Sequence, residues 1–513
     1  MVSLLIKNAS VIDGTGAPAL SADIAIGGDR IRRIAPNLDL AAERTIDAAG
    51  YAAAPGFIDI HAHGGSAVID GRTADSKVHD GVTTEVDGNC GYSPFPTRME
   101  DGGYRSAADF FEILSDAGMS INRAFLTGLG SVRSFVMGRS SRAASPREIE
   151  LMQTEVIRSL DEGCFGVSAG LIYPPGCFAS QEEIAAVAKP AGDRGALYAT
   201  HMRSESGQIE EAIDESEFIA RTSGARLQIS HVKLSGKQNW HKIDWLDRRL
   251  HGMIASGIDL ACDRYPYTAS ATDIGVILPN WVHDGPVEAR MERLHDPGTR
   301  SRIEQEVFAD HPEPEYWDSI VLSSVPVDED PGYNGKTLRE IAEIRGERPV
   351  DAVMNLLAQH REKPTAVFFS MFEEVLRRIL SWPFVCIGSD ARARVLQDRL
   401  SPEKPHPRAY GTFARFLGKY VREEKLMSLE EGVRRITSLP AQRLGLTDRG
   451  VLREGAFADI TVFAPGAIAD RATYEDPHQT SAGIPYVIVN GQPVIEKGVH
   501  NGLLPGRALR RAV

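Results

Sequence analysis

The spacing of hydrophobic and polar positions along this 513-residue chain differs between its ends and its middle. Over residues 1–50, and again over residues 449–513, apolar and polar side chains alternate with a period of two, which is typical of half-buried strands. The C-terminal stretch places Asn490-Gly491 between two apolar runs, a dipeptide that favours a tight hairpin turn. Each end therefore predicts a small β unit, antiparallel at the N-terminus, and the two units could pair into one β-sandwich.

Between these ends, apolar runs of strand length alternate with helical patterns. The expected strands are the segments 56–63, 81–90, 124–130, 164–170, 196–202, 226–232, 259–267 and 384–390. Two of the intervening helices begin with capping boxes, Ser145 with Glu148 and Ser180 with Glu183. This alternation predicts an α/β protein with a TIM-like (β/α)8 barrel, although a doubly wound sheet has the same pattern.

One connection is too long to be a loop. More than a hundred residues separate the expected seventh and eighth strands, so this part of the chain must carry structure of its own. We expect an insertion at about 272–380, with helices near 285–294 and 301–309. This insertion could form a lid over the strand ends or could simply pack against the barrel. The predicted organisation is a composite β domain of residues 1–54 and 440–513, and a barrel domain of residues 55–439 that contains the insertion.

Composition and charge narrow the class of protein. The formal net charge of −13 argues against a nucleic-acid binder, which needs a basic face. Five widely spaced cysteines without a CxxC pair argue against a disulfide framework and favour a reducing compartment. No run of 18 apolar residues and no signal-peptide pattern occurs, so we expect a cytoplasmic enzyme that binds no membrane. Nothing in the sequence predicts the oligomeric state.

Side chains of the metal-ligand type gather at the ends of the expected strands. His61 and His63 lie two residues apart in the first strand, so both imidazoles point to one side. Later strands end in Cys90, His201, His231 and Asp390. In a barrel these ends form a single mouth, where catalytic residues come from several strands. A thiolate with several imidazoles indicates zinc or a similar transition ion rather than magnesium or calcium.

Two rival motifs fail on their context. Gly166-Val-Ser168-Ala-Gly170 matches the serine-hydrolase elbow, which requires a helix directly after the serine. Pro174 and Pro175 follow too soon for such a helix. Gly128-Leu-Gly130 begins a dinucleotide-binding fingerprint, but Arg133 occupies the place of the third glycine, so no Rossmann cofactor is expected.

The motifs taken together resemble the D-aminoacylase (N-acyl-D-amino-acid deacylase) family of the amidohydrolase superfamily. They cover nearly the whole chain in order: PGFIDIHAH, GVTTEVDGNCG, GVSAGLIYPPG, YATHMRSES, LQISHVKLSG, YPYTAS, IGSD, HPRAYGTF, AQRLGLTDRGVLREGAFADITVF and PGRALRR. Two departures stand out. Gly64-Gly65 follow the paired histidines where the family often has acidic residues, and the serine expected after YPY is replaced by Ala271 or shifted to Ser270.

The resemblance implies a TIM-like barrel with a zinc ion held tightly by Cys90, His201 and His231. It also implies a second, weaker metal position near His61, His63 and Asp390. The fourth expected strand lacks the lysine that bridges two metals in many superfamily relatives, which counts against hydantoinase or dihydroorotase chemistry.

The same resemblance implies hydrolysis of the amide bond of N-acyl-D-amino acids, with Asp390 moving the proton. It assigns the substrate carboxylate to Lys233, Arg408, Tyr173 and Tyr265. Related deacylation of N-acyl-β-amino acids, acidic N-acyl-D-amino acids or dipeptide-like amides stays open, as does an inactive scaffold. The preference for D over L substrates is implied by the resemblance alone, because enantiomers share every functional group.

Overall fold

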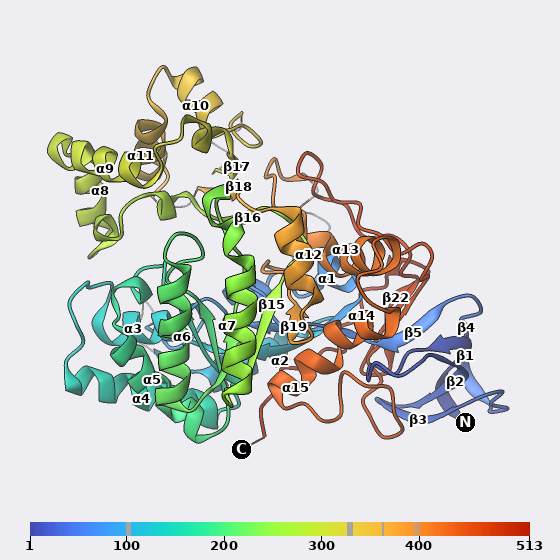
Figure 1. Ribbon diagram of the computed structural model, residues 1–513. Helices are drawn as coiled ribbons and strands as arrows, with labels where there is room; N and C mark the ends of the chain where they lie inside the picture. The colour runs from blue at the N-terminus through green and yellow to red at the C-terminus, as the bar shows by residue number, and fades with distance from the viewer. Residues whose placement is uncertain (99–103, 326–331, 362–363, 396–397, 399, 513) are drawn as a thin grey trace.

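Two consecutive sheets of parallel strands form the centre of the protein, with helices around them (Figure 1). The computed structural model describes residues 1–98, 104–325, 332–361, 364–395, 398 and 400–512. The barrel strands are β6 (Phe57–Asp59), β7 (Val82–Asp87), β10 (Asn122–Phe125) continued by β11 (Thr127–Gly128), β12 (Gly166–Gly170), β13 (Leu197–His201), β14 (Arg226–Ile229), β15 (Leu260–Arg264) and β19 (Val385–Ile387). Seven of the eight predicted segments contain their strand whole, and the third, 124–130, covers the end of β10 and all of β11.

The barrel strands close into a ring between the first and the last of them. A parallel bridge joins Ala62 to Ala391, and the Asp390 amide donates a hydrogen bond of 2.8 Å to the His61 carbonyl. A doubly wound sheet has two open edges, whereas this sheet returns to its first strand. The prediction of a TIM-like barrel is therefore confirmed.

Helices cover the outside of the barrel, because each has an apolar stripe that faces the strands. They are α1 (Asp75–Val78), α2 (Ala107–Ala117), α3 (Leu129–Met137), α4 (Pro146–Asp161), α5 (Gln181–Asp193), α6 (Ile209–Ser223), α7 (Ile243–Ala255), α12 (Glu373–Ser381), α13 (Arg408–Arg415), α14 (Leu429–Ile436) and α15 (Ser438–Leu444). On α6, for example, Ile209, Ile213 and Ala220 are buried in the same core as Leu227 of β14. No helix among the described residues is long and apolar enough to cross a membrane.

The two predicted capping boxes differ in outcome. At the start of α4, Ser145 and Glu148 satisfy each other's backbone amides, as predicted. At the start of α5, Ser180 accepts a hydrogen bond from the Glu183 amide, but the reciprocal half of the box is not formed. The Glu183 carboxylate instead pairs with the buried Arg133 guanidinium at 2.8 Å, because an ion pair in the interior competes successfully with a surface cap.

Strands from both ends of the chain share one nine-stranded sheet. It contains β1 (Val2–Val11), β2 (Leu20–Gly27), β3 (Arg30–Ala35), β4 (Ala42–Asp47) and β5 (Ala52–Pro55) with β20 (Ile460–Phe463), β21 (Tyr486–Val489), β22 (Gln492–Glu496) and β23 (Val499–His500). The antiparallel prediction for the N-terminal unit is wrong in part, since β4 and β5 both run parallel to β1. Alternation reports which face of a strand is buried, not the direction of its neighbour. The division into two domains stays a prediction.

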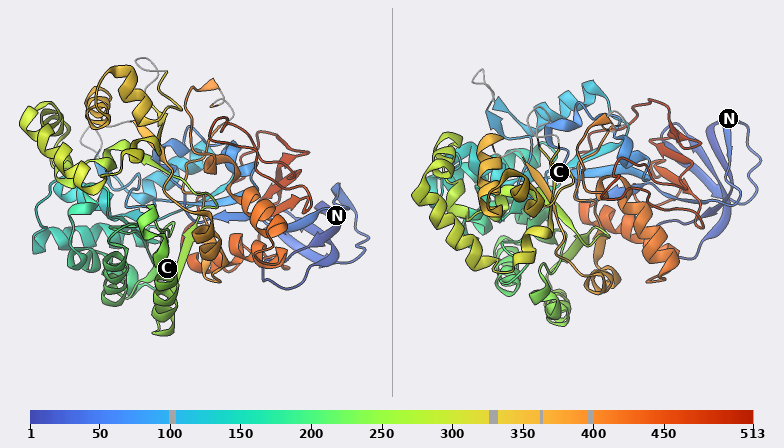
Figure 2. Two further views of the ribbon diagram at one scale, coloured as in Figure 1. Left: turned by 45° about the horizontal axis from the view of Figure 1, so that its top comes forward. Right: turned by 90° about the horizontal axis from the view of Figure 1, so that it is seen from above.

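The long connection between β15 and β19 folds around a core of its own. Its antiparallel sheet contains β16 (Ser270–Asp273), β17 (Ile320–Ser324) and β18 (Thr365–Phe368), and its helices are α8 (Val287–His295), α9 (Pro297–Asp310), α10 (Leu338–Arg345) and α11 (Pro349–Gln359). Buried residues such as Ile303, Leu322 and Val353 belong to this core. The following helix, α12, contributes Val375 to the barrel core instead. In Figure 2 the insertion and the terminal sheet lie at opposite ends of the molecule.

Candidate metal centre and active site

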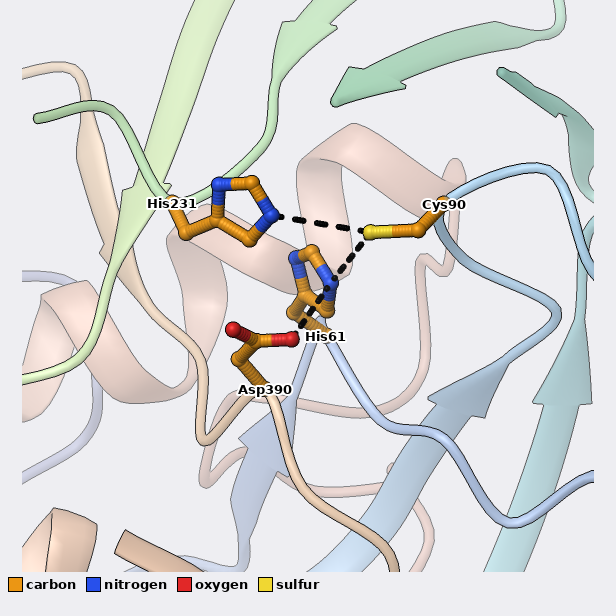
Figure 3. A group of neighbouring side chains, drawn as sticks. All are labelled: His61, Cys90, His231 and Asp390. Carbon is orange, nitrogen blue, oxygen red and sulfur yellow. Dashed lines mark hydrogen bonds and ion pairs between the residues drawn. The ribbon is translucent and has the colours of Figure 1, made fainter. Parts of the chain in front are cut away.

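Four side chains from different strand ends point toward one another at the barrel mouth (Figure 3). The Cys90 sulfur lies 3.4 Å from Nε2 of His61 and 3.6 Å from Nε2 of His231. The Asp390 carboxylate lies 3.3 Å from the same His61 nitrogen. Nε2 of His63 lies 2.8 Å from Asp390 and 3.2 Å from His61. The segments that carry these side chains are scattered over the sequence, and the barrel brings their polar atoms into contact.

His201 lies on the other side of His231. Their rings are edge to face with centroids 4.4 Å apart, and Glu205 has an oxygen 3.7 Å from Nε2 of His201. Glu205 also contacts Nδ1 of His231 at 2.9 Å and Nζ of Lys233 at 2.5 Å. Sequence reasoning missed Glu205. The signal available was its position four residues after His201 at the end of a strand, within HMRSES.

A buried carboxylate orients the His61 imidazole and holds the backbone of His231. Asp263, at the end of β15, lies 2.8 Å from Nδ1 of His61 and accepts a 2.8 Å hydrogen bond from the His231 backbone amide. Gln228 donates a 3.0 Å hydrogen bond to its other oxygen. A carboxylate behind a ligand histidine sets the tautomer and leaves Nε2 free to face the cluster. Asp263 was also missed, because it lies in the middle of the predicted strand 259–267, whereas β15 itself ends at Arg264.

Three of the converging residues have strained backbones. Cys90, His231 and Asp390 have φ angles of +50°, +35° and +52°, in the left-handed region that non-glycine residues rarely adopt. Such conformations cost about 1–3 kcal/mol each and persist where the surrounding structure imposes them, most often at functional sites. At each strand end this conformation turns the chain sharply as the strand stops.

The serine of the GxSxG motif has a structural role. Ser168 is fully buried, donates a 2.5 Å hydrogen bond to the Gly88 carbonyl and accepts one of 3.0 Å from the Gly91 amide. Both partners flank Cys90, so Ser168 holds the loop that carries the thiol. The sequence-based rejection of a serine nucleophile agrees with this arrangement.

A buried lysine stabilises the seam between the first and last barrel strands, where His61 and Asp390 lie. Lys77, which is 2% exposed, contacts Asp59 at 2.6 Å, the Ser389 hydroxyl at 2.5 Å and the Ala391 carbonyl at 3.0 Å. Asp59 in turn accepts hydrogen bonds from the backbone amides on both sides of the seam, Ser389 at 2.9 Å and His61 at 3.2 Å. The relative position of the two strand ends is therefore fixed by buried, charge-assisted bonds.

The electrostatics of the mouth favour ionised donors. Burial alone would raise the pKa of the Cys90 thiol, but the adjacent His61 and His231 imidazoles hold it well below its usual value. Burial would likewise raise the pKa of Asp390, but the Arg408 guanidinium and the same imidazoles hold it well below the usual range. Burial lowers the pKa of His201, which keeps its imidazole neutral. Burial would lower the pKa of His61 and His231 too, but the carboxylates and the thiolate around them raise it, so these two imidazoles must release protons when they bind a metal ion.

Two of the four residues expected to contact the substrate line a cavity at the barrel mouth. Tyr173 and Arg408 line a cavity of about 410 Å³ that also exposes His63, Cys90 and Asp390. Arg408 contacts Asp390 at 2.7 Å, and the Tyr173 hydroxyl lies 3.0 Å from that of Thr272 in the insertion.

The other two expected contacts, Lys233 and Tyr265, are not among the residues that line this cavity. Lys233 is 3% exposed and engaged by Glu205 and Nδ1 of His231, the latter at 2.8 Å. Tyr265 is fully buried and its hydroxyl has no hydrogen-bond partner. Its ring lies 4.5 Å from the Arg408 guanidinium. The contacts of Lys233 suit a residue that orients His231. A direct contact of Lys233 or Tyr265 with the substrate stays a prediction.

The donor set fits a transition-metal ion. His201 has both ring nitrogens buried without a hydrogen-bond partner, an arrangement that a buried polar group rarely tolerates. The neighbouring donors are one sulfur, further imidazole nitrogens and a carboxylate oxygen within 4.8 Å of one another. Sulfur and imidazole ligands with carboxylate are those that zinc takes. The barrel and this cluster at its strand ends define a metal-dependent hydrolase.

Comparison with known proteins agrees with this class. Residues 187–495 match one model of the amidohydrolase family and residues 52–251 match another. The chain is 34% identical to a D-aminoacylase of Alcaligenes xylosoxydans xylosoxydans, over 99% of this chain and 97% of the relative. The chain belongs to the amidohydrolase family.

Solved structures extend the similarity to the whole fold. A D-aminoacylase described with a binuclear metal centre, with one-metal activation and second-metal attenuation, superposes with a TM-score of 0.84 at 32% identity over 100% of both chains. An N-acyl-D-glutamate deacylase from Bordetella bronchiseptica, complexed with zinc and a phosphonate inhibitor that mimics the tetrahedral intermediate, has the same TM-score at 32% identity over 99% of both chains.

Proposed function

We propose that this protein is a zinc-dependent N-acyl-D-amino-acid deacylase, which hydrolyses a linear amide to a carboxylate and a free D-amino acid. The observation that carries this proposal is the convergence of the Cys90 sulfur, the strand-end imidazoles and Asp390 beside a cavity that exposes Cys90, His63 and Asp390 and that Arg408 also lines. The deacylases to which the chain is similar supply the substrate class.

Cys90, His201 and His231 would hold a tightly bound zinc ion, and His61, His63 and Asp390 a second, weaker one. Cys90 is the soft donor of the first set, and the unpartnered nitrogens of His201 lie beside it. Zinc bound at this point supplies Lewis acidity, which lowers the pKa of water to about 7 and polarises an amide carbonyl. Lys233 and Asp263 would fix the His231 and His61 rings through the nitrogens that face away from the cluster.

Asp390 would move the proton. Its carboxylate is ionised and reachable from the cavity, so it can accept a proton from the water that adds to the amide carbon. As the C–N bond breaks, Asp390 returns that proton to the nitrogen, and the amine leaves neutral rather than as an amide anion. Arg408 lies next to Asp390 and offers a planar fork for the α-carboxylate of the substrate.

Paired enantiomers test the proposal. We expect the zinc-loaded protein to release amine from N-acetyl-D-methionine, N-acetyl-D-phenylalanine or N-acetyl-D-glutamate much faster than from the L enantiomers. Equal turnover of both enantiomers, or turnover of neither, would refute a D-specific deacylase.

A further inference from the structure

A second and larger cavity adjoins the catalytic one. It has a volume of about 900 Å³ and shares Tyr92 with the cavity that exposes Cys90 and Asp390. Tyr92 comes two residues after Cys90, is 46% exposed, and its hydroxyl donates a 2.8 Å hydrogen bond to the Pro174 carbonyl. Pro174 also lines the larger cavity, so the two spaces meet at this tyrosine.

Three arginines line this second space, which we call the arginine cavity: Arg98 of β8 (Thr97–Arg98), Arg105 of β9 (Tyr104–Arg105), and Arg139 after α3. The described residues that line it include no aspartate or glutamate. Among the described residues, none of the three arginines has a carboxylate within ion-pair distance. The arginines close by on the sequence are paired, Arg133 with Glu183 at 2.8 Å and Arg142 with Glu148 at 2.5 Å.

Among the described residues, these arginines contact an aromatic ring and a carbonyl oxygen rather than a carboxylate. The Arg98 guanidinium lies 4.6 Å from the centre of the Phe135 ring, on the wall of the same cavity. Arg139 donates one 3.3 Å hydrogen bond to the Pro174 carbonyl, and its Nε is buried without a partner. Ser66 and Ser134 add hydroxyls to the lining. On a protein with a net charge of −13, a pocket lined by three arginines and by no described carboxylate attracts anions.

The order of atoms across the scissile amide indicates which half of the substrate, acyl or amino acid, lies toward the arginine cavity. Arg408 and Asp390, 2.7 Å apart, would hold the carboxylate and the nitrogen of the amino acid. The acyl carbon lies across the scissile bond from that nitrogen, so the acyl chain leads away from this pair. Tyr92 and the arginine cavity adjoin the Cys90 side of the catalytic cavity. An acetyl group ends one carbon beyond the carbonyl and would leave the arginines without a partner.

We propose that the arginine cavity binds the acyl end of the substrate, and that this end carries a carboxylate, as in N-succinyl- and N-glutaryl-D-amino acids. Arginine guanidinium groups match a carboxylate in charge and in planar geometry. This inference rests on the proposed deacylase function and adds a substrate class to it.

The test compares acyl groups of equal length on one neutral amino acid. N-glutaryl- and N-pentanoyl-D-methionine both have five acyl carbons and differ in the terminal carboxylate. We expect kcat/KM for the glutaryl substrate to exceed that for the pentanoyl substrate by about tenfold at low salt, and this ratio to fall as salt screens the charges. The succinyl substrate reports the chain length that reaches the arginines.

Substitutions locate the effect. Arg98→Gln with Arg105→Gln should remove most of the glutaryl-to-pentanoyl ratio, and Arg98→Glu with Arg105→Glu should shift the preference toward a 5-aminopentanoyl group. Arg147→Gln is the matched control, since Arg147 lies on the surface of α4 with its side chain 74% exposed and paired with Glu150. Its glutaryl-to-pentanoyl ratio should equal that of the unmodified protein.

The outcomes separate this inference from the proposed function. If N-acetyl-D-methionine is hydrolysed but the glutaryl-to-pentanoyl ratio is near one, or is unaffected by the arginine substitutions, the acyl assignment is overturned and the deacylase function stands. If no acyl derivative is hydrolysed, the deacylase function itself fails. Free glutarate and inorganic phosphate are added to the N-acetyl reaction as a third arm. A change in turnover there, without a preference for the glutaryl substrate, would show that the cavity binds a separate anion and would also overturn the acyl assignment.

Discussion

Two buried polar clusters of this protein have opposite characters. The mouth cluster, Cys90 with His61, His201, His231 and Asp390, contains unpartnered imidazole nitrogens and three left-handed backbones. The second, which we call the junction cluster, contains Arg449, Asp459, Asn490 and Asn122, each no more than 5% exposed. It joins the terminal sheet to β10 of the barrel, and no fully buried side-chain nitrogen or oxygen of these four residues lacks a hydrogen-bond partner.

The junction cluster shows what a structural network looks like. Arg449 pairs with Asp459 and donates a 2.8 Å hydrogen bond to the Asn490 side chain. Asn490 donates one of 2.8 Å to Asn122 and one of 2.7 Å to the Pro505 carbonyl. Every charge has its counter-charge, as a buried network requires in order to stabilise a fold. The mouth cluster lacks this completeness, and the unpartnered nitrogens of His201 beside a thiol indicate binding chemistry rather than stability. Disrupting the mouth should therefore affect activity, and disrupting the junction should affect folding.

Metal removal gives the largest expected effect. Dialysis against a chelator should abolish deacylase activity, because the mouth depends on a cation to bring water to reactivity near neutral pH. Far-UV circular dichroism should be unchanged, since the apolar barrel core does not include the mouth residues. Addition of zinc should restore activity. Unfolding on chelation would contradict the distinction between the clusters, because the mouth would then be a structural element too.

Asp390→Asn removes the proton carrier while keeping the side chain's size. We expect kcat to fall by about 10²- to 10⁴-fold, the usual contribution of a positioned general acid or base. Zinc content at the Cys90 position should be retained, which atomic absorption measures. Activity that survives in this variant would show that another group moves the proton.

Arg449→Met tests the junction cluster. It leaves the Asp459 carboxylate buried without its counter-charge, so we expect the free energy of unfolding to fall by about 3–5 kcal/mol. Chemical denaturation measures the loss, and kcat of the protein that remains folded should change little. A fall in kcat comparable to that of Asp390→Asn, at unchanged stability, would show that the junction cluster acts on catalysis instead.

The sequence predicted the barrel and the strand-end ligand residues for a physical reason. Alternation of strands and helices leaves few architectures, and parallel strands that close into a ring must present their C-terminal ends at one mouth. Any ligand-type residue at such an end, such as Cys90 or His231, could therefore be placed without coordinates. Asp263 escaped this rule, because the predicted strand 259–267 continues past it. In the structure β15 ends at Arg264, and Asp263 faces the back of the His61 imidazole.

What could not be predicted depends on contacts between segments that are distant in sequence. The parallel pairing of β4 and β5 with β1 depends on how the chain crosses over, which alternation does not record. The contacts of Lys233 with Glu205 and His231 depend on side-chain directions at the ends of β13 and β14. The arginine cavity joins β8, β9 and the end of α3, segments whose proximity no local pattern encodes.

Asn490→Gly gives the smallest expected effect and isolates the hydrogen bonds of the junction from backbone strain. Asn490 has a φ of +47°, which glycine adopts freely, so the substitution removes the side-chain bonds to Arg449, Asn122 and Pro505 without straining the hairpin turn. Loss of these buried hydrogen bonds should lower the free energy of unfolding by about 1–3 kcal/mol, less than Arg449→Met, because no charge loses its counter-charge. Asn37→Gly is the control, since Asn37 also has a positive φ of +52° but is exposed, and its effect should stay within about 0.5 kcal/mol. Equal effects of the two substitutions would show that the junction is held by its turn geometry, and that its side-chain network contributes nothing measurable.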